Sequence, residues 1–376
     1  MKTPFVFGRI ATDKDFTDRK KETEHLVQNF ISHVNTMLIS PRRWGKSSLV
    51  HKASQIALKK DKSLRFCFID LYNIRSEEQF YQMLAQEVLK VSSGKIESMI
   101  DSAKKFLGQF IPKITFSSEP YAEFSIGLDW KEVKRHPDDI LNLPEKIGIE
   151  KDIHFIICID EFQNISGFEN NLEFQKKVRS HWQRHKQTSY CLYGSKRNML
   201  MDVFTSPSMP LYKFGDLIFL QKISTEEWEP FIKKRFKETG KIINKEQARS
   251  IICLTDCHPY YVQQLAQLSW LRTEHECTAD VVENAFENLT LQLSLLFQTL
   301  TDELSNTQIN FIKAVLNDEP KLSSKEVILR FNLGTSANVL RIKNALFKKE
   351  IIDIRSGKIS FLDPVYKHWL KSYYFK

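Results

Sequence analysis

Hydrophobic and polar positions follow two different rhythms along the chain. Within residues 1–220, short apolar runs alternate with longer stretches of helical spacing. The apolar runs predict five strands, at 36–40, 64–70, 154–160, 189–194 and 217–220. Most are apolar throughout, which is typical of parallel strands covered by helices on both faces. Helices are predicted between them at 47–60, 76–91 and 171–186, so this part of the chain is expected to be α/β.

One segment, residues 114–130, breaks the strand–helix rhythm. Single apolar and polar residues alternate there around the sequence Ser-Ser-Glu-Pro. Such alternation around a turn sequence predicts a β-hairpin. We therefore expect a hairpin inserted into the α/β layer and not a member of the parallel sheet.

After residue 220 the pattern becomes helical. Helices are predicted at 225–238, 245–254, 260–275 and 280–303, and again at 307–316, 324–331 and 336–349. Two short strands, 351–354 and 359–361, follow and flank a turn, which is the order of a winged helix. The expected domains are an α/β domain over 1–220, a helical lid over 221–303 and a C-terminal winged helix over 304–376.

Residues 40–48, Ser-Pro-Arg-Arg-Trp-Gly-Lys-Ser-Ser, join the first strand to the first helix. A P-loop has the pattern G-x-x-x-x-G-K-[ST] at such a junction, and Ser40 replaces its first glycine. The backbone N–H groups of the loop would surround the β-phosphate of ATP or ADP. Lys46 would reach the β- and γ-phosphates, and the Ser47 hydroxyl would ligate Mg²⁺. The candidate nucleotide contacts on the loop are Pro41, Arg42, Arg43, Trp44, Gly45, Lys46, Ser47 and Ser48, with Trp44 serving packing more than ligand binding.

Two later strands end in polar residues suited to the same chemistry. The strand 154–160 ends in Asp160 and Glu161. Asp160 is the candidate second metal residue, and Glu161 the candidate general base that polarises the attacking water. The next strand is followed by Ser195, which would contact the water or the γ-phosphate, and by Arg197, which could offset developing charge. The alternative for Asp160 and Glu161 is an ordinary strand end with acidic residues, and the alternative for Ser195 and Arg197 is a solvated loop.

Composition limits the class of protein without naming it. An apolar fraction of 42% argues against disorder, and the net charge of +9 permits nucleic-acid binding without indicating it. No apolar run approaches the roughly 18 residues of a membrane span, and the first residues lack the apolar core of a signal peptide. A cytoplasmic protein with no membrane partner is the expectation.

Four segments together resemble one family: F-G-R-I with F-T-D-R-K-K-E, L-I-S-P-R-R-W-G-K-S-S-L-V, I-D-E-F-Q-N-I and Y-G-S-K-R-N-M-L. They resemble the prokaryotic AAA+-type P-loop ATPases, an archaeal and bacterial group related to the STAND ATPases and, more distantly, to origin-recognition initiators. H-P-Y-Y-V-Q-Q-L and F-L-D-P-V-Y-K-H-W-L also fit, so the resemblance covers nearly the whole chain. It implies that Asp18 and Arg19 pack beside the adenine. It also implies that Pro259 lies near it, although Cys257 stands where the family has glycine.

The function expected from these residues is an ATP-binding, ATP-hydrolysing switch that produces ADP and phosphate. Nucleotide would sit between the α/β domain and the lid, and the winged helix would contact double-stranded DNA or a protein partner. The alternative is a DNA-binding regulator that nucleotide stabilises with little or no hydrolysis. A small-molecule kinase is disfavoured because no second substrate lid is recognisable. The candidate nucleic-acid contacts are Arg341, Lys343 and Lys358, and the alternative for them is a solvated face.

Overall fold

The structure is a computed structural model, and it describes residues 3–12, 15–93, 96–107, 113–115, 125–127, 137–355 and 357–376. The chain forms two compact units. One is the continuous segment Arg19–Gln221, and the other combines Met1–Asp18 with Lys222–Lys376.

The unit Arg19–Gln221 is built on a five-stranded sheet in the order β2-β5-β6-β1-β7, with every neighbouring pair parallel. Its strands are β1 (Thr36–Ile39), β2 (Leu64–Asp70), β5 (His154–Asp160), β6 (Thr188–Gly194) and β7 (Asp216–Phe219). All five predicted strands are present, with ends within one residue of those expected. Because the strands are parallel, their carboxyl ends lie at one edge, where Asp70 is opposite Asp160 and Ile39 opposite Gly194.

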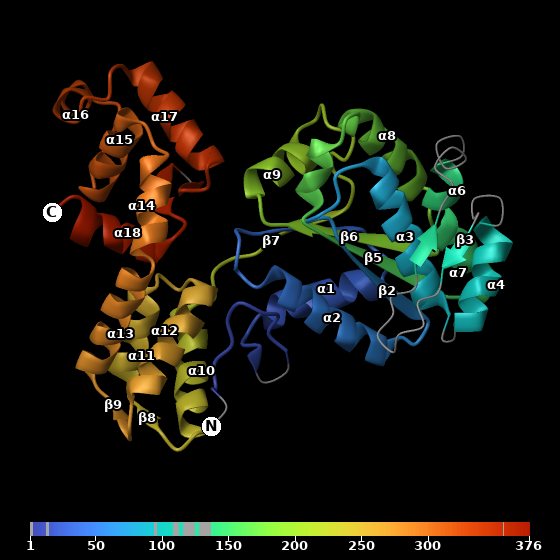
Figure 1. The fold of residues 1–376 in the computed structure, drawn as a ribbon, viewed down its shortest axis with the longest axis horizontal. Helices are drawn as coiled ribbons and strands as arrows, with labels where there is room; N and C mark the ends of the chain where they lie inside the picture. The colour runs from blue at the N-terminus through green and yellow to red at the C-terminus, as the bar shows by residue number, and fades with distance from the viewer. Residues whose placement is uncertain are drawn as a thin grey trace. The chain divides into compact units, whose positions relative to one another are not determined.

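Helices cover both faces of this sheet (Figure 1). They are α1 (Lys20–Ile31), α2 (Lys46–Lys60), α3 (Glu77–Ser92), α4 (Ile96–Leu107), α6 (Pro137–Leu141), α7 (Leu143–Lys151), α8 (Asn171–Trp182), α9 (Arg197–Thr205) and a 3₁₀ helix, Phe162–Gly167. In Figure 1, α1 and α2 lie on one face and α3 and α8 on the other. β5 is buried between the two layers up to its last residue, which explains why its sequence is a continuous apolar run.

The inserted segment holds a short antiparallel pair. β3 (Lys113–Thr115) pairs with β4 (Ser125–Gly127), so that Lys113 is opposite Gly127 and Thr115 opposite Ser125. This pair is separate from the five-stranded sheet. The rest of the predicted hairpin 114–130, including its turn, lies outside the described residues.

The other unit is mainly helical. Its elements are α10 (Thr225–Lys237), β8 (Ile242–Ile243), α11 (Lys245–Leu254), α12 (Pro259–Arg272), β9 (Glu276–Cys277), α13 (Ala279–Gln292), α14 (Ser294–Asp302), α15 (Asn306–Leu316), α16 (Lys325–Arg330), α17 (Ser336–Lys348), β10 (Ile352–Arg355), β11 (Lys358–Phe361), α18 (Pro364–Trp369) and a π-helical turn, Leu370–Tyr374. The helix predicted over 280–303 is in fact two helices, α13 and α14, which meet at Leu293. The short parallel pair of β8 with β9 was not predicted, because two-residue strands leave no pattern in the sequence.

The described residues of the segment Met1–Asp18 belong to this helical unit, whereas the sequence predicts a domain over 1–220. Phe5 is buried against Phe231 and Phe236 of α10. Arg235 of α10 donates to the Pro4 carbonyl and forms an ion pair with Asp15, Nη2 to Oδ1, at 2.6 Å. One apolar side chain and one buried guanidinium therefore hold the N-terminal segment on α10.

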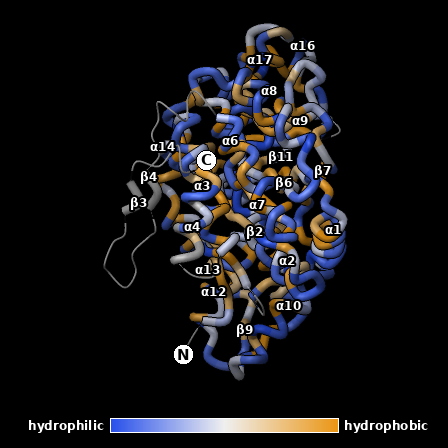
Figure 2. Tube along the Cα trace, turned by 90° about the vertical axis from the view of Figure 1, so that its right-hand side faces the viewer, coloured by the Kyte–Doolittle hydropathy of each residue, from blue (hydrophilic) through white to orange (hydrophobic). Residues whose placement is uncertain are grey.

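A single hydrophobic core extends from α10 through the winged helix. The terminal helix α18 packs against α14, since the Tyr366 hydroxyl lies 2.8 Å from Thr301 Oγ1 and Trp369 Nε1 donates to Ser294 Oγ at 3.0 Å. Hydrophobic and hydrophilic residues are interspersed along the helices of both units (Figure 2). Accordingly, no helix in the described part of the chain is both long and apolar enough to cross a bilayer.

Candidate nucleotide-binding site

The loop 40–48 turns from the buried strand β1 into α2. Ser40 is buried, and its Oγ donates to the Pro41 carbonyl at 3.1 Å. Gly45 has a φ of 87° and Arg43 a φ of 66°, both in the left-handed region. An added Cβ at Gly45 would meet nothing within 4 Å, so backbone conformation and not space requires glycine there.

The other loop residues divide into buried and exposed side chains. Pro41, Trp44 and Ser48 are buried, whereas Arg42 and Arg43 are exposed. The Trp44 side chain is therefore buried in packing, as expected. A contact of its backbone with phosphate stays a prediction. Backbone N–H groups at the start of a helix can serve an anion, and α2 begins at Lys46, within this loop.

Arg19 holds this loop in place. Its side chain is only 3% exposed. Nη2 donates to the Trp44 carbonyl at 3.1 Å, and Nη1 donates to the Gln221 carbonyl at 2.5 Å and pairs with Glu22 at 3.2 Å. Arg19 thus fastens the loop to the chain that follows β7, a contact that the sequence did not reveal. That Arg19 also packs beside the adenine stays a prediction.

Two further residues assigned to the adenine, Asp18 and Pro259, belong to the other unit. Pro259 is the first residue of α12, where its missing N–H is of no consequence because the first turn of a helix has no partner for it. Their contact with nucleotide also stays a prediction.

Side chains from α2 and β5 meet at the carboxyl edge of the sheet. Ser47 Oγ donates to Asp160 Oδ2 at 2.6 Å. Lys46 Nζ lies 3.5 Å from Glu161 Oε1 and 3.9 Å from Asp160 Oδ1, and all three side chains are largely buried. β6 lies between β1 and β5, so Lys46 and Ser47 reach past the end of β6 to make these contacts. The structure therefore brings together the four residues predicted for phosphate, metal and base.

The end of β6 adds a fifth member to this cluster. Ser195 is 7% exposed, and its Oγ donates to Glu161 Oε2 at 2.8 Å, while its N–H lies 3.4 Å from the same oxygen. Arg197 is the first residue of α9, and its N–H donates to the Ser195 carbonyl at 3.0 Å. The roles predicted for Ser195 and Arg197 toward a γ-phosphate remain predictions, and the contact between Ser195 and Glu161 is new.

Sequence reasoning missed one residue of the cluster, Gln163. Its Nε2 donates to Glu161 Oε2, and the side chain is almost completely buried. Gln163 lies in the 3₁₀ helix directly after β5, two residues beyond Glu161. The sequence offered one signal for this role: in the segment I-D-E-F-Q-N-I, a polar glutamine follows the two acidic residues closely.

The two adjacent carboxyl groups have opposite electrostatic environments. Burial raises the pKa of Asp160, and this effect exceeds the lowering by Lys46 and by the Ser47 hydrogen bond. Burial also acts to raise the pKa of Glu161, but Lys46 and the hydrogen bonds from Gln163 and Ser195 outweigh it and lower that pKa. Glu161 is thus ionised at neutral pH and can accept a proton.

The donor set next to Lys46 suits a magnesium ion. Ser47 supplies a hydroxyl and Asp160 a carboxylate, and both are the oxygen ligands that this hard cation prefers. A cation there would also favour the ionised form of Asp160, which burial alone disfavours. The residues present therefore fit the ion.

Comparison with known proteins identifies the fold. Residues 295–372 match a family model described as a probable winged helix domain. Among solved structures, the Walker-type ATPase PABY2304 of Pyrococcus abyssi aligns with a TM-score of 0.65 at 18% identity, covering 98% of this chain and 99% of that one. The fold is that of an AAA+-type P-loop ATPase. Both the predicted fold class and the predicted winged helix are confirmed.

Two ORC proteins of Aeropyrum pernix also align with this fold. The ORC2 protein, solved as ADPNP-ADP complexes, aligns with a TM-score of 0.57 at 13% identity over 98% of both chains. The ORC1 protein, solved in complex with DNA, aligns with a TM-score of 0.50 at 11% identity, over 96% of this chain and 94% of that one. No curated protein matches the sequence.

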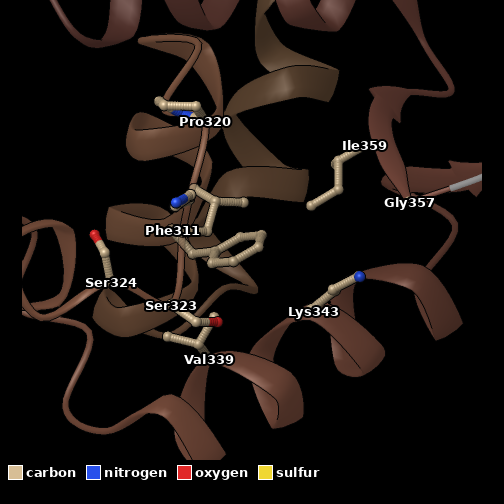
Figure 3. A pocket seen from close by; sticks show the side chains of 10 residues that line it. Phe311, Pro320, Ser323, Ser324, Val339, Lys343, Gly357 and Ile359 are labelled. Carbon is tan, nitrogen blue, oxygen red and sulfur yellow. The ribbon is translucent and has the colours of Figure 1, made fainter.

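The winged helix does not present its three candidate DNA contacts as one cluster. Arg341 on α17 is exposed, and its Nη2 donates to Asn338 Oδ1 at 2.8 Å on the same helix. Lys343 follows two residues later, which is roughly 200° around the helix. It lines a cavity of about 490 Å³ together with Val339, Gly357 and Ile359, and Figure 3 shows it facing the wing. Lys358 is exposed on β11.

Proposed function

We propose that this chain binds ATP with Mg²⁺ at the carboxyl edge of the sheet and hydrolyses it to ADP and phosphate. The observation that supports this proposal best is the convergence of Lys46, Ser47, Asp160 and Glu161 within hydrogen-bond and ion-pair distances. Each supplies a different requirement of phosphoryl transfer: a cation for the phosphates, two metal ligands and a base. The ORC2 relative, solved with nucleotide, shares this fold.

The contacts indicate how these residues would act. Lys46 lies beside Asp160 and Glu161, so its ammonium group is already at the site. A bound triphosphate would replace these carboxylates as its ion-pair partner. Glu161 would accept a proton from a water as that water attacks the γ-phosphorus. The bond from the γ-phosphorus to the bridging oxygen breaks, and its electron pair stays on ADP. Mg²⁺, held through Ser47 and Asp160, would supply charge neutralisation at the phosphates.

We further propose that the nucleotide acts as a switch that the winged helix reports, with double-stranded DNA as the preferred partner. The argument for DNA rests on Arg341 and Lys358, which are exposed, and on the ORC1 relative, solved with DNA. A protein partner is the other candidate, because only these two of the three candidate cations are exposed on the described surface.

Glu161 distinguishes hydrolysis from simple nucleotide binding. Wild-type protein and Glu161→Gln are compared for ATP turnover, with and without duplex DNA, and for radiolabelled ATP retained after gel filtration. Loss of a general base lowers turnover by about 10²- to 10⁴-fold, and the variant should retain ATP. Glu169→Gln, at an exposed glutamate of the same unit, is the control.

Two results would contradict parts of this proposal. Wild-type turnover in Glu161→Gln would refute the role of Glu161 as general base. Tight ATP binding without turnover in the wild type would favour the second candidate, a nucleotide-stabilised DNA-binding regulator. That candidate draws support from Glu161 Oε2, which already accepts hydrogen bonds from Ser195 and Gln163.

A further inference from the structure

The side-chain amide of Gln163 lies between Glu161, directly after β5, and Gly194, the last residue of β6. Its Nε2 donates to Glu161 Oε2. Its Oε1 lies next to Gly194, where an added Cβ would overlap with that oxygen. The side chain is 1% exposed, so water does not serve either end of the amide.

Chemistry determines which end of the amide faces Glu161. An ionised carboxylate only accepts hydrogen bonds, so the group that faces it must be the NH₂ group. The carbonyl Oε1 then turns toward Gly194, where it has no hydrogen-bond partner among the described residues. An unsatisfied buried acceptor is unfavourable, so the hydrogen bond from the NH₂ group to Glu161 has to stabilise this arrangement.

Gly194 is the residue that allows this arrangement. Its φ is not in the left-handed region, so its backbone conformation does not require glycine. The close approach of Gln163 Oε1 does require it, because any larger residue would displace the amide. Gly194 also immediately precedes Ser195, the second donor to the same carboxylate oxygen.

These contacts distribute the two carboxylate oxygens of Glu161 between different tasks. Oε2 accepts from Gln163 and from both the hydroxyl and the N–H of Ser195, which leaves it no free lone pair. Oε1 faces Lys46 at 3.5 Å. When phosphate draws Lys46 away, Oε1 is the oxygen left with capacity to accept a proton.

We propose that Gln163 is a positioning residue that fixes the orientation of Glu161 so that Oε1 faces the attacking water, with Gly194 making room for its amide. This inference rests on the proposed ATP hydrolysis. Gln163 itself contacts no substrate in this scheme and acts only through Glu161.

Three variants test the kinetic consequence. Gln163→Met keeps the length of the side chain and removes the amide, and Gly194→Ala displaces the amide without changing Gln163. Each should lower kcat by about 10- to 100-fold while KM for ATP stays within about twofold, since only the orientation of the base is lost. The double variant should be no worse than the more affected single variant, because both substitutions remove one interaction. Gln175→Met, at a fully buried glutamine of α8, is the control and should keep wild-type kcat.

A second measurement reads the contact directly in nucleotide-free protein. With ¹⁵N-labelled glutamine side chains, the Gln163 amide signal is assigned by its absence in Gln163→Met. One of its protons should be shifted downfield by the carboxylate, and Glu161→Ala and Gly194→Ala should each abolish that shift. Melting curves of all variants exclude global unfolding as the cause.

The outcomes separate this inference from the proposed function. An unshifted Gln163 amide in the folded wild type, wild-type kcat in Gln163→Met, or additive effects in the double variant would each overturn the positioning role. The shifted signal in a protein that does not hydrolyse ATP would support the geometry of Gln163 and Glu161 and refute the hydrolysis.

Discussion

The carboxyl edge of the sheet and the surface of the winged helix both contain charged residues, but they are organised in opposite ways. At the sheet edge, residues far apart in sequence converge: Ser47 is 2.6 Å from Asp160, and Ser195 is 2.8 Å from Glu161. On the winged helix, Arg341 donates to Asn338 of its own helix, and Lys343 faces a cavity.

Burial explains what this difference means for function. A buried charge has to be compensated by its neighbours, so each residue at the sheet edge depends on the others. An exposed cation is solvated by water and acts nearly alone, and salt screens it. Substitutions at the sheet edge should therefore have large and specific effects, whereas those on the winged helix should be small and sum independently.

The largest effect is expected at Lys46. Lys46→Ala should weaken ATP binding by about 100-fold, because it removes a charge-assisted contact to the phosphates in a partly desolvated site. Isothermal calorimetry measures the change, with Lys59→Ala on the exposed face of the same helix as the control. Unchanged ATP affinity in Lys46→Ala would mean that the convergence at the sheet edge does not serve nucleotide.

Asp160 should show a different dependence from Lys46. In Asp160→Asn the Mg²⁺ concentration for half-maximal ATP turnover should rise by about 10-fold or more, because a metal-site carboxylate is removed. Some nucleotide should remain bound without the ion. Asp152→Asn, at an exposed aspartate in the left-handed conformation that Asn also adopts, is the matched control. Equal Mg²⁺ dependence in Asp160→Asn and wild type would refute the metal role.

The dependence on burial should also appear at the opposite edge of the sheet, at His154. Burial, together with His33 stacked at 3.4 Å, lowers the pKa of His154 to about 4. The unfolded chain therefore binds more protons than the folded one between about pH 6.5 and 4. This contribution to stability is complete above pH 6.5 and decreases by roughly 2 kcal/mol as the pH falls to 4.

Urea denaturation at a series of pH values measures this loss. His154→Gln should flatten the decline of the unfolding free energy. An equally steep decline in His154→Gln would assign the acid sensitivity to other groups.

The smallest effects are expected on the winged helix. If duplex DNA binds there, Arg341→Ala combined with Lys358→Ala should reduce the salt slope of binding by about two, one for each phosphate that is no longer neutralised. Lys343→Ala should leave the slope unchanged, since this lysine faces the cavity. Fluorescence anisotropy tests both. A reduced slope in Lys343→Ala would show that the three cations act as one surface, and no binding at low salt would favour a protein partner.

The sequence predicted those features that depend on neighbouring residues. A buried parallel strand such as β5 is an unbroken apolar run, and the loop 40–48 is recognisable because glycine, lysine and serine must follow a strand at set spacing. The proximity of Asp160 to Ser47 was accessible for the same reason. Asp160 ends one predicted strand, Ser47 lies in the loop after another, and the carboxyl ends of parallel strands share an edge.

Contacts between distant segments were not accessible. Gln163 touches Gly194 across β5 and β6, and Arg19 touches the Trp44 and Gln221 carbonyls, and no local pattern marks either pair. Phe5 is one apolar residue among many until the structure shows it in the core of the helical unit. The separation of Arg341 from Lys343, in contrast, follows from helical periodicity alone and could have been predicted.

The packing of Phe5 against α10 has a consequence for the order in which the chain can fold during synthesis. The unit Arg19–Gln221 is one continuous segment, so all of its residues are available as soon as that segment has left the ribosome. A hydrogen bond from Arg19 to the Gln221 carbonyl joins its first and last residues. Phe5 belongs to the other unit, and its ring partners Phe231 and Phe236 lie on α10, which emerges some two hundred residues later. Vectorial synthesis therefore favours folding of the unit Arg19–Gln221 first, and Phe5 stays exposed until α10 is made.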